Sequence, residues 1–116
     1  MKIKAIAATV LIFGLSTFAT AKGQGNVYSP EQGVICDKKS NFCVDSKGIS
    51  MGLTKEYLGE KAVAKFEKMT AGITDMDMSS YTLSNGLSCD SHQKICKKSK
   101  WDDKADKHWT KILFGT

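Results

Sequence analysis

Apolar residues form three groups along the chain, and the first group lies at the N-terminus. An uncharged, mostly apolar run from Ala5 to Phe18 follows the cationic start Met1 to Lys4 and ends in Ala19-Thr20-Ala21. This three-part layout is typical of a secretory signal peptide, and the run is shorter than the roughly 20 residues that span a bilayer. We therefore expect cleavage after Ala21, export to the periplasm, and one mature domain over residues 22–116 without a transmembrane segment.

The second group predicts an amphipathic helix in the middle of the chain. Four apolar residues recur at helical spacing between Lys and Glu side chains: Ala62, Val63, Phe66 and Met69. This pattern indicates a helix whose apolar stripe packs on the core. Just before it, Thr54 is suited to cap the N-terminus of a short turn that ends at Gly59.

The third group lies at the C-terminus, where Trp109, Ile112, Leu113 and Phe114 follow a charged segment. A tail with so many large apolar groups is expected to dock as a short helix or strand that closes the core. Residues 71–80 are expected to form a loop that leads into a strand at residues 81–84.

A self-match at an offset of 53 residues organises the chain. The segment from Tyr28 to Asp37 aligns with the segment from Tyr81 to Asp90, and the second cysteine of each unit aligns as well. The two segments agree at a tyrosine, a glycine, a cysteine and an aspartate. We therefore expect two related units, at about residues 28–45 and 81–98.

Six residues separate the cysteines of each unit, a spacing that suits a β-hairpin with a polar four-residue tip. Cysteines at opposed positions would place their α-carbons about 4.5 Å apart, within the range of a disulfide. Four cysteines permit three pairings, and loop entropy alone would prefer pairs between the units. Proximity within each unit favours the two local pairs, Cys36–Cys43 and Cys89–Cys96.

Together these patterns predict a small α+β domain stapled by disulfides. Two similar β-hairpins flank an amphipathic helix, and the C-terminal apolar segment closes the core. Structural zinc sites and thiol oxidoreductases usually have more closely spaced cysteines, so a metal or redox role for these four is not expected.

The net charge of +5 comes entirely from lysine, since the chain has no arginine. Arginine supplies the forked donors that nucleic-acid readers commonly use, so we expect no nucleic-acid binding. Trp101 is a candidate anchor for a protein partner in the envelope, because tryptophan dominates many interfaces. Several lysines lie close to it in the sequence. These candidate contact residues are Lys94, Lys97, Lys98, Lys100 and Trp101.

No group of residues with catalytic spacing occurs in the sequence. His92 lies on a predicted hairpin tip, His108 lies beside a tryptophan, and neither has a nucleophile nearby in the sequence. Asp75 and Asp77 lack the other ligands of a calcium loop. We therefore expect no catalytic residues, no metal and no cofactor, and a small hydrolase or redox enzyme is the least favoured function.

Several motifs resemble those of the YcgJ-like, Fels prophage-protein-like family. They are Ser29-Pro-Glu-Gln-Gly-Val-Ile-Cys-Asp37, Gly48-Ile-Ser, Leu53-Thr, Tyr57-Leu-Gly59, Asn85-Gly86, and Cys89-Asp90 up to Cys96. The resemblance implies a small exported protein of enteric or related bacteria, sometimes associated with prophages. It supplies no catalytic residues to transfer.

Two non-enzymatic functions fit the sequence. The first is a periplasmic binding or inhibitory module whose stapled hairpins present loops to a protein, a role common among small disulfide-rich domains. The second is an envelope stress or structural factor whose lysines are drawn to anionic lipid or cell-wall polymer.

Overall fold

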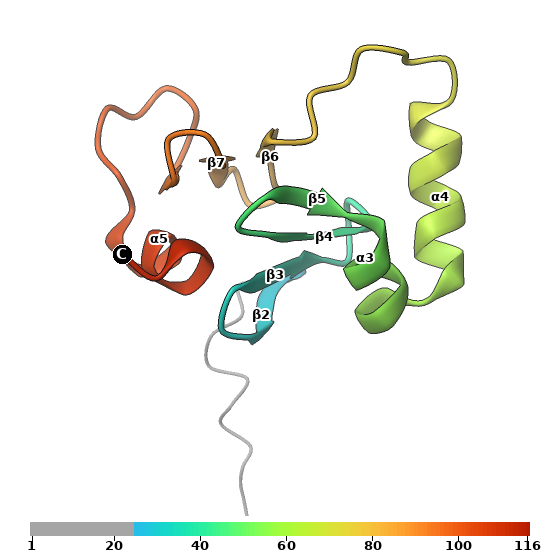
Figure 1. The fold of residues 1–116 in the computed structure, drawn as a ribbon, viewed down its shortest axis with the longest axis horizontal. Helices are drawn as coiled ribbons and strands as arrows, with labels where there is room; N and C mark the ends of the chain where they lie inside the picture. Colours follow the sequence, from blue (N-terminus) through green and yellow to red (C-terminus); the bar gives the residue numbers. More distant parts are fainter. Residues whose placement is uncertain (1–24) are drawn as a thin grey trace, which may run out of the picture.

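The computed structural model describes residues 25–116, and the predicted signal peptide over residues 1–21 lies outside the described residues. In the described part, the chain forms two antiparallel sheets and three helices, which confirms the expected α+β class (Figure 1). No helix within residues 25–116 combines the length and apolar character that a membrane crossing requires.

The first sheet contains the first pair of cysteines. Its four strands lie in chain order: β2 (Val27–Glu31), β3 (Val34–Asp37), β4 (Phe42–Asp45) and β5 (Gly48–Ser50). A four-residue turn joins β3 to β4, as the cysteine spacing predicts, and Cys36 lies opposite Cys43. Strand β2 pairs with the other side of β3 and places Tyr28 opposite Cys36.

The second sheet repeats this pairing with three short strands. They are β6 (Ser80–Thr82), β7 (Ser88–Asp90) and β8 (Ile95–Lys97). Tyr81 lies opposite Cys89, which in turn lies opposite Cys96. The two sheets meet where the backbone N–H of Ile49 donates to the carbonyl of Met78 at 2.8 Å.

Helix α3 (Met51–Leu58) corrects one prediction from the sequence. Its N-cap is Ser50, whose Oγ accepts a hydrogen bond from the N–H of Leu53 at 3.2 Å. Thr54, expected to be the cap, instead lies inside the helix and is fully buried. The helix begins earlier because Ser50, the last residue of β5, already supplies the capping hydroxyl.

Helix α4 (Glu60–Thr70) has a narrower buried stripe than the sequence predicts. Ala62 and Phe66 are buried, whereas Met69, expected in the core, is 60% exposed. Figure 1 shows that α4 stands at the edge of the molecule, and its C-terminal end extends beyond the first sheet. Met69 therefore has no opposing layer to pack against.

The main core extends across both sheets. The ring of Phe42 packs edge-to-face against the rings of Phe66 in α4 and Tyr81 in the second sheet. The ring centres are 5.6 Å and 6.1 Å apart, respectively. Helix α5 (Lys107–Phe114) covers the core from the other side, where Trp109 and Leu113 are buried. The C-terminal segment closes the core, as predicted.

Candidate functional site

The two disulfides join the residues that the sequence pairs locally, Cys36–Cys43 and Cys89–Cys96. Their α-carbons are 4.0 Å apart in each case, and the described residues include no free cysteine. Disulfides persist in oxidising compartments, so this pair indicates an extracytoplasmic environment.

A buried threonine supports the second cysteine of each pair. The hydroxyl of Thr54 accepts a hydrogen bond from the N–H of Cys43 at 2.8 Å, and Thr110 accepts one from Cys96 at 2.9 Å. Both threonines lie in helices of eight residues, α3 and α5. Each hairpin is thus fixed to its own helix by a bond that satisfies a buried backbone donor.

An aspartate organises the turn of each hairpin. Asp37 and Asp90 follow the first cysteines, and Oδ1 of each accepts hydrogen bonds from two backbone N–H groups of its turn. Each turn ends on a residue with positive φ, Asn41 at 66° and Lys94 at 58°. Shared local geometry therefore accounts for the aspartate that both units have in common.

Asp37 has a further role, which sequence reasoning missed. Its carboxylate is fully buried and also accepts hydrogen bonds from the backbone N–H and the hydroxyl of Ser84, at 2.6 and 2.8 Å. The bonds within the turn can be inferred from the repeated Cys-Asp pair. The bond to Ser84 cannot, because it depends on how the two units pack.

The loop between β8 and α5 carries Trp101, which is 82% exposed. A hydrogen bond of 2.6 Å from the N–H of Asp106 to the carbonyl of Cys96 closes the base of this loop. At the 53-residue offset, Ser46-Lys47-Gly48 corresponds to Ser99-Lys100-Trp101. The second unit thus has an exposed tryptophan where the first has a buried glycine.

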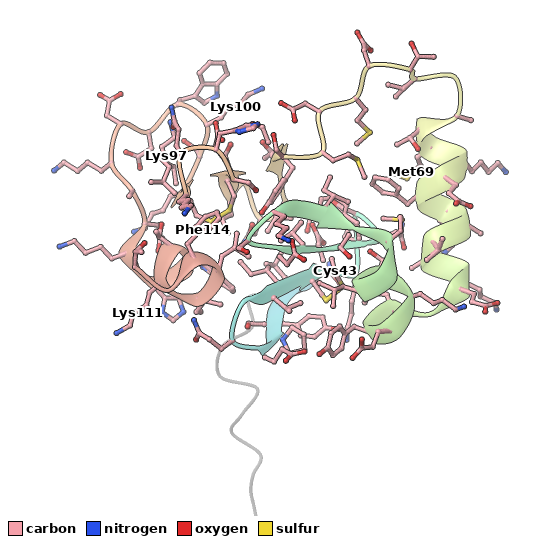
Figure 2. The ribbon with its side chains drawn as sticks, in the orientation of Figure 1. Cys43, Met69, Lys97, Lys100, Lys111 and Phe114 are labelled. Atoms are coloured by element: carbon pink, nitrogen blue, oxygen red, sulfur yellow. A yellow bond between two sulfur atoms is a disulfide. The ribbon has the colours of Figure 1, made fainter. Side chains whose placement is uncertain are left out.

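The predicted lysine contacts occupy three different places. Lys94 lies in the β7–β8 turn, Lys97 belongs to β8, and Lys98 and Lys100 are exposed in the loop. The ammonium of Lys100 lies 5.1 Å from the centre of the Trp101 ring. Figure 2 shows Lys97 and Lys100 on the same side of the molecule, away from Met69 on α4.

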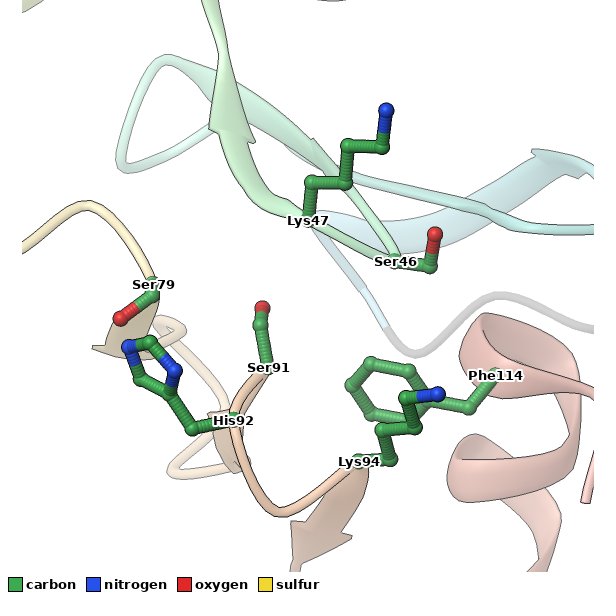
Figure 3. Close-up of a pocket in the computed structure, with 7 residues that line it drawn as sticks. All are labelled: Ser46, Lys47, Ser79, Ser91, His92, Lys94 and Phe114. Atoms are coloured by element: carbon green, nitrogen blue, oxygen red, sulfur yellow. The ribbon is translucent and has the colours of Figure 1, made fainter.

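A cavity forms where the turns of the two units face each other. It is lined by Ser46 and Lys47 of the β4–β5 turn, by Ser79, by the β7–β8 turn, and by Phe114 at the end of α5 (Figure 3). Sequence reasoning singled out Lys94 and His92 individually but did not bring them together with the first unit. Nothing in the local sequence signals this meeting of turns.

The three tyrosines all have phenol pKa values above the usual 10.0. Tyr57 donates a hydrogen bond to Glu31, and this bond, with the negative charge beside it, raises the pKa of Tyr57 to about 12. Burial raises the pKa of Tyr81, whose hydroxyl is buried without a hydrogen-bond partner in the described part of the chain. Burial also raises the pKa of Tyr28.

The carboxylates near the cavity bind backbone groups. Asp77 accepts hydrogen bonds from the N–H and the hydroxyl of Ser79, and these bonds lower the pKa of Asp77. Within residues 25–116, no group of three or more His, Cys, Asp and Glu side chains could hold a metal ion.

Comparison with known proteins agrees with the motifs in the sequence. The family described as "YcgJ protein" matches residues 27–114. "Uncharacterized protein YcgJ" of Escherichia coli (strain K12) is 35% identical over 106 residues, which cover 85% of this chain and 82% of that protein. No solved structure matches significantly.

Proposed function

The chain belongs to the YcgJ protein family, and from this premise we propose that it is an exported, non-enzymatic module that binds a protein partner. The binding surface is the loop from residue 98 to residue 106, with Trp101 as its anchor. One observation carries the proposal, the 82% exposure of Trp101 on a closed loop. Tryptophan is strongly enriched among residues that dominate interface energy, and exposure of this ring to water is unfavourable in the free protein.

The loop is well suited to hold its anchor in place. The N–H of Trp101 donates to the hydroxyl of Ser99 at 3.3 Å, and the N–H of Asp102 donates to the Ser99 carbonyl at 3.1 Å. At the base of the loop, the Cys89–Cys96 disulfide and the hydrogen bond from the N–H of Asp106 to the carbonyl of Cys96 hold its two ends together. A preorganised loop loses less conformational entropy on binding, which supports affinity.

The charges around Trp101 favour a protein partner over an anionic membrane. Lys98 and Lys100 precede the tryptophan, but Asp102 and Asp103 follow it directly. A negatively charged lipid surface would attract the first pair and repel the second. A protein surface can match both signs around an apolar pocket, and such complementarity gives specificity.

The location of the proposed partner follows from the cysteines and the N-terminal pattern. Both disulfides suit an oxidising compartment, and residues 1–21 have the layout of a signal peptide. The partner is therefore sought among proteins of the bacterial envelope, with the periplasm as the place of contact.

Site-specific photocrosslinking in living cells tests this proposal. Position 101 receives a photoreactive benzophenone side chain, and the matched control carries the same group at Met69, an apolar residue on α4 that is 60% exposed. We expect a defined protein adduct from position 101 that is absent from position 69. An aromatic probe at position 101 keeps the bulk of the indole, so binding should survive the replacement.

Two outcomes would contradict the proposal. Equal protein adducts from both positions would mean that the loop has no special role. Adducts with lipid alone from position 101 would favour the alternative, an envelope factor bound to anionic lipid, and vesicle binding that weakens with salt would then support that alternative.

A further inference from the structure

A groove lies between α4 and the β3–β4 turn, and its rim is basic. Lys38 borders it from the turn, and Lys61 and Lys65 border it from α4. Three less exposed residues of α3 and α4 complete the lining that concerns us here: Tyr57, Leu58 and Ala62. The volume of about 270 Å³ is below the roughly 300 to 1,000 Å³ of pockets that enclose a small molecule. This groove, named the α4 groove below, is therefore too small to enclose a typical ligand.

The basic rim continues along one face of α4. Lys61, Lys65 and Lys68 are exposed and follow one another at intervals of four and three residues, which places them on one stripe of the helix. At about 100° per residue, Glu60 and Glu67 share a different stripe, roughly a third of a turn away. Like charges four residues apart repel each other, so the stripe of lysines does not stabilise the helix. A negatively charged ligand would relieve this repulsion.

The lysines of the rim have no carboxylate partner in the part of the chain that the structure describes. The one ion pair among those residues joins Lys55 to Glu60 at 3.5 Å. In the turn, Lys38 and Lys39 are exposed, and the ammonium of Lys38 lies 5.2 Å from the centre of the Tyr28 ring. An aromatic ring carries no net charge, so this contact leaves the charge of Lys38 uncompensated.

Three carboxylates lie near the α4 groove without lining it. Glu31 accepts a hydrogen bond from the hydroxyl of Tyr57, and Glu56 lies close to the same phenol. The third, Asp37 at the base of the turn, is fully buried and accepts bonds from N–H groups of its own turn and from Ser84. The two exposed carboxylates thus lie beside the Tyr57 hydroxyl, and the rim along α4 and the turn stays positive.

We propose that the α4 groove binds an extended acidic segment of a protein. Side chains on one face of an extended chain lie roughly 6.6 Å apart, and residues four apart in a helix are separated by about 6 Å along its axis. Carboxylates at every second position of the segment therefore match Lys61 and Lys65. Ammonium and carboxylate groups form charge-assisted hydrogen bonds, which are stronger than neutral ones.

The shape of the surface favours a polypeptide segment over an anionic membrane. Lys38 stands on one side of the groove and the lysines of α4 stand on the other, with Leu58 and Ala62 among the residues between them. A segment lying in the groove would bring its carboxylates to both sides and its methylene groups to Leu58. A flat lipid surface would meet the lysines alone and leave the apolar lining without a contact.

The α4 groove and the loop with Trp101 are separate surfaces. Figure 1 shows α4 at one edge of the molecule and the loop before α5 at the other. None of the residues that line the groove belongs to residues 98–106. Binding at the groove therefore does not require the partner of the Trp101 loop, and both surfaces can be occupied at once.

Fluorescence anisotropy of a labelled acidic peptide, titrated with the purified protein, tests the proposal. The probe is a short acetylated peptide with glutamate at every second position and serine between. The matched probe carries glutamine in place of each glutamate. We expect saturable binding of the glutamate peptide that weakens as salt is added, and no binding of the glutamine peptide.

Paired substitutions separate the groove from general charge. The K61Q/K65Q variant should weaken binding of the glutamate peptide about fivefold or more, because two ion pairs are lost. The matched control is K107Q/K111Q, which removes the same charge at the same spacing from exposed positions of α5 and should leave binding nearly unchanged. K61R/K65R keeps both charges and should retain most of the binding. Trp101→Ala should have no effect, so the groove and the partner-binding loop can fail independently.

Four results would overturn the proposal. The first is no saturable binding of the glutamate peptide, and the second is an equal loss in K61Q/K65Q and K107Q/K111Q, which would show attraction to net charge alone. The third is a glutamine peptide that binds as tightly as the glutamate peptide. The fourth is binding of phosphatidylglycerol vesicles that K61Q/K65Q weakens, in the absence of peptide binding, since the lysines would then dock on an anionic membrane.

Discussion

Asp37 accepts a hydrogen bond of 2.6 Å from the backbone N–H of Ser84, a residue 47 positions later in the chain. The same carboxylate fixes the turn of the first hairpin, so one side chain fixes a local turn and joins the two units. Its counterpart Asp90 is only half-buried and serves its own turn. Two residues at equivalent places in related hairpins thus differ in what they stabilise.

Replacing Asp37 with asparagine should destabilise the protein far more than the same change at Asp90. The amide NH₂ of Asp37→Asn would face a backbone donor in a fully buried site, so we expect a loss of about 2 to 3 kcal/mol in the free energy of unfolding. Asp90→Asn keeps one carbonyl oxygen for its turn and should cost below about 1 kcal/mol. Urea denaturation gives the free energy of unfolding of both variants. Equal losses of this free energy would contradict the role of Asp37 in joining the two units.

The buried threonines predict a second pair of effects. Thr54→Val and Thr110→Val keep the shape of the side chain but leave the N–H of Cys43 or Cys96 without its acceptor. Each change should cost about 1 to 3 kcal/mol, whereas the serine variants should retain most of the stability. Thermal unfolding of the four variants tests this expectation. Valine variants as stable as the serine variants would show that the hydroxyls are dispensable.

Gly48 should tolerate no side chain. A Cβ at this position would lie 2.3 Å from the Met78 carbonyl oxygen, at the contact between the two sheets. Gly48→Ala should therefore cost about 3 kcal/mol or more, since that backbone must move. Gly72 also has positive φ, but a Cβ added there would have no atom within 4 Å, so Gly72→Ala should cost only about 1 to 2 kcal/mol. Similar unfolding midpoints for both variants would be inconsistent with close packing at Gly48.

The tyrosines predict a loss of stability at alkaline pH. Folding raises all three phenol pKa values above 10.0, so the unfolded chain ionises first and is favoured as the pH rises. The phenol contribution to stability is complete below pH 10 and decreases as the pH rises through the folded pKa of Tyr57, about 12. Tyrosinate absorbance of folded and urea-unfolded protein checks this prediction. Coincident titration curves of the folded and unfolded protein would refute it. Tyr57→Phe should remove the part of the alkaline loss of stability that is due to Tyr57.

The repeat made much of the scaffold predictable from the sequence. A six-residue spacing between Cys36 and Cys43 fixes opposed strand positions, and its duplication at Cys89 and Cys96 supports local pairing. The C-terminal apolar cluster likewise predicted a docked segment, because Trp109 and Leu113 have no stable place in water.

The features that sequence reasoning missed depend on how separate segments pack. Ser91 and Lys47 form one cavity only because two turns face each other, and Met69 is exposed because α4 extends past the sheet. Periodicity identifies a helix face but does not say how long the opposing layer is. The cap at Ser50 was missed for a local reason, since the apolar pattern of α3 is weak and Thr54 offered an alternative hydroxyl.

The most direct test of the partner-binding function is the dissociation constant of the purified partner identified by crosslinking, measured with Trp101→Ala and with Met69→Ala. Both side chains are exposed, so neither change should alter stability by more than about 0.5 kcal/mol. We predict that Trp101→Ala weakens binding about tenfold or more, while Met69→Ala leaves it unchanged. Equal affinity of the wild-type protein and Trp101→Ala would contradict the proposed function.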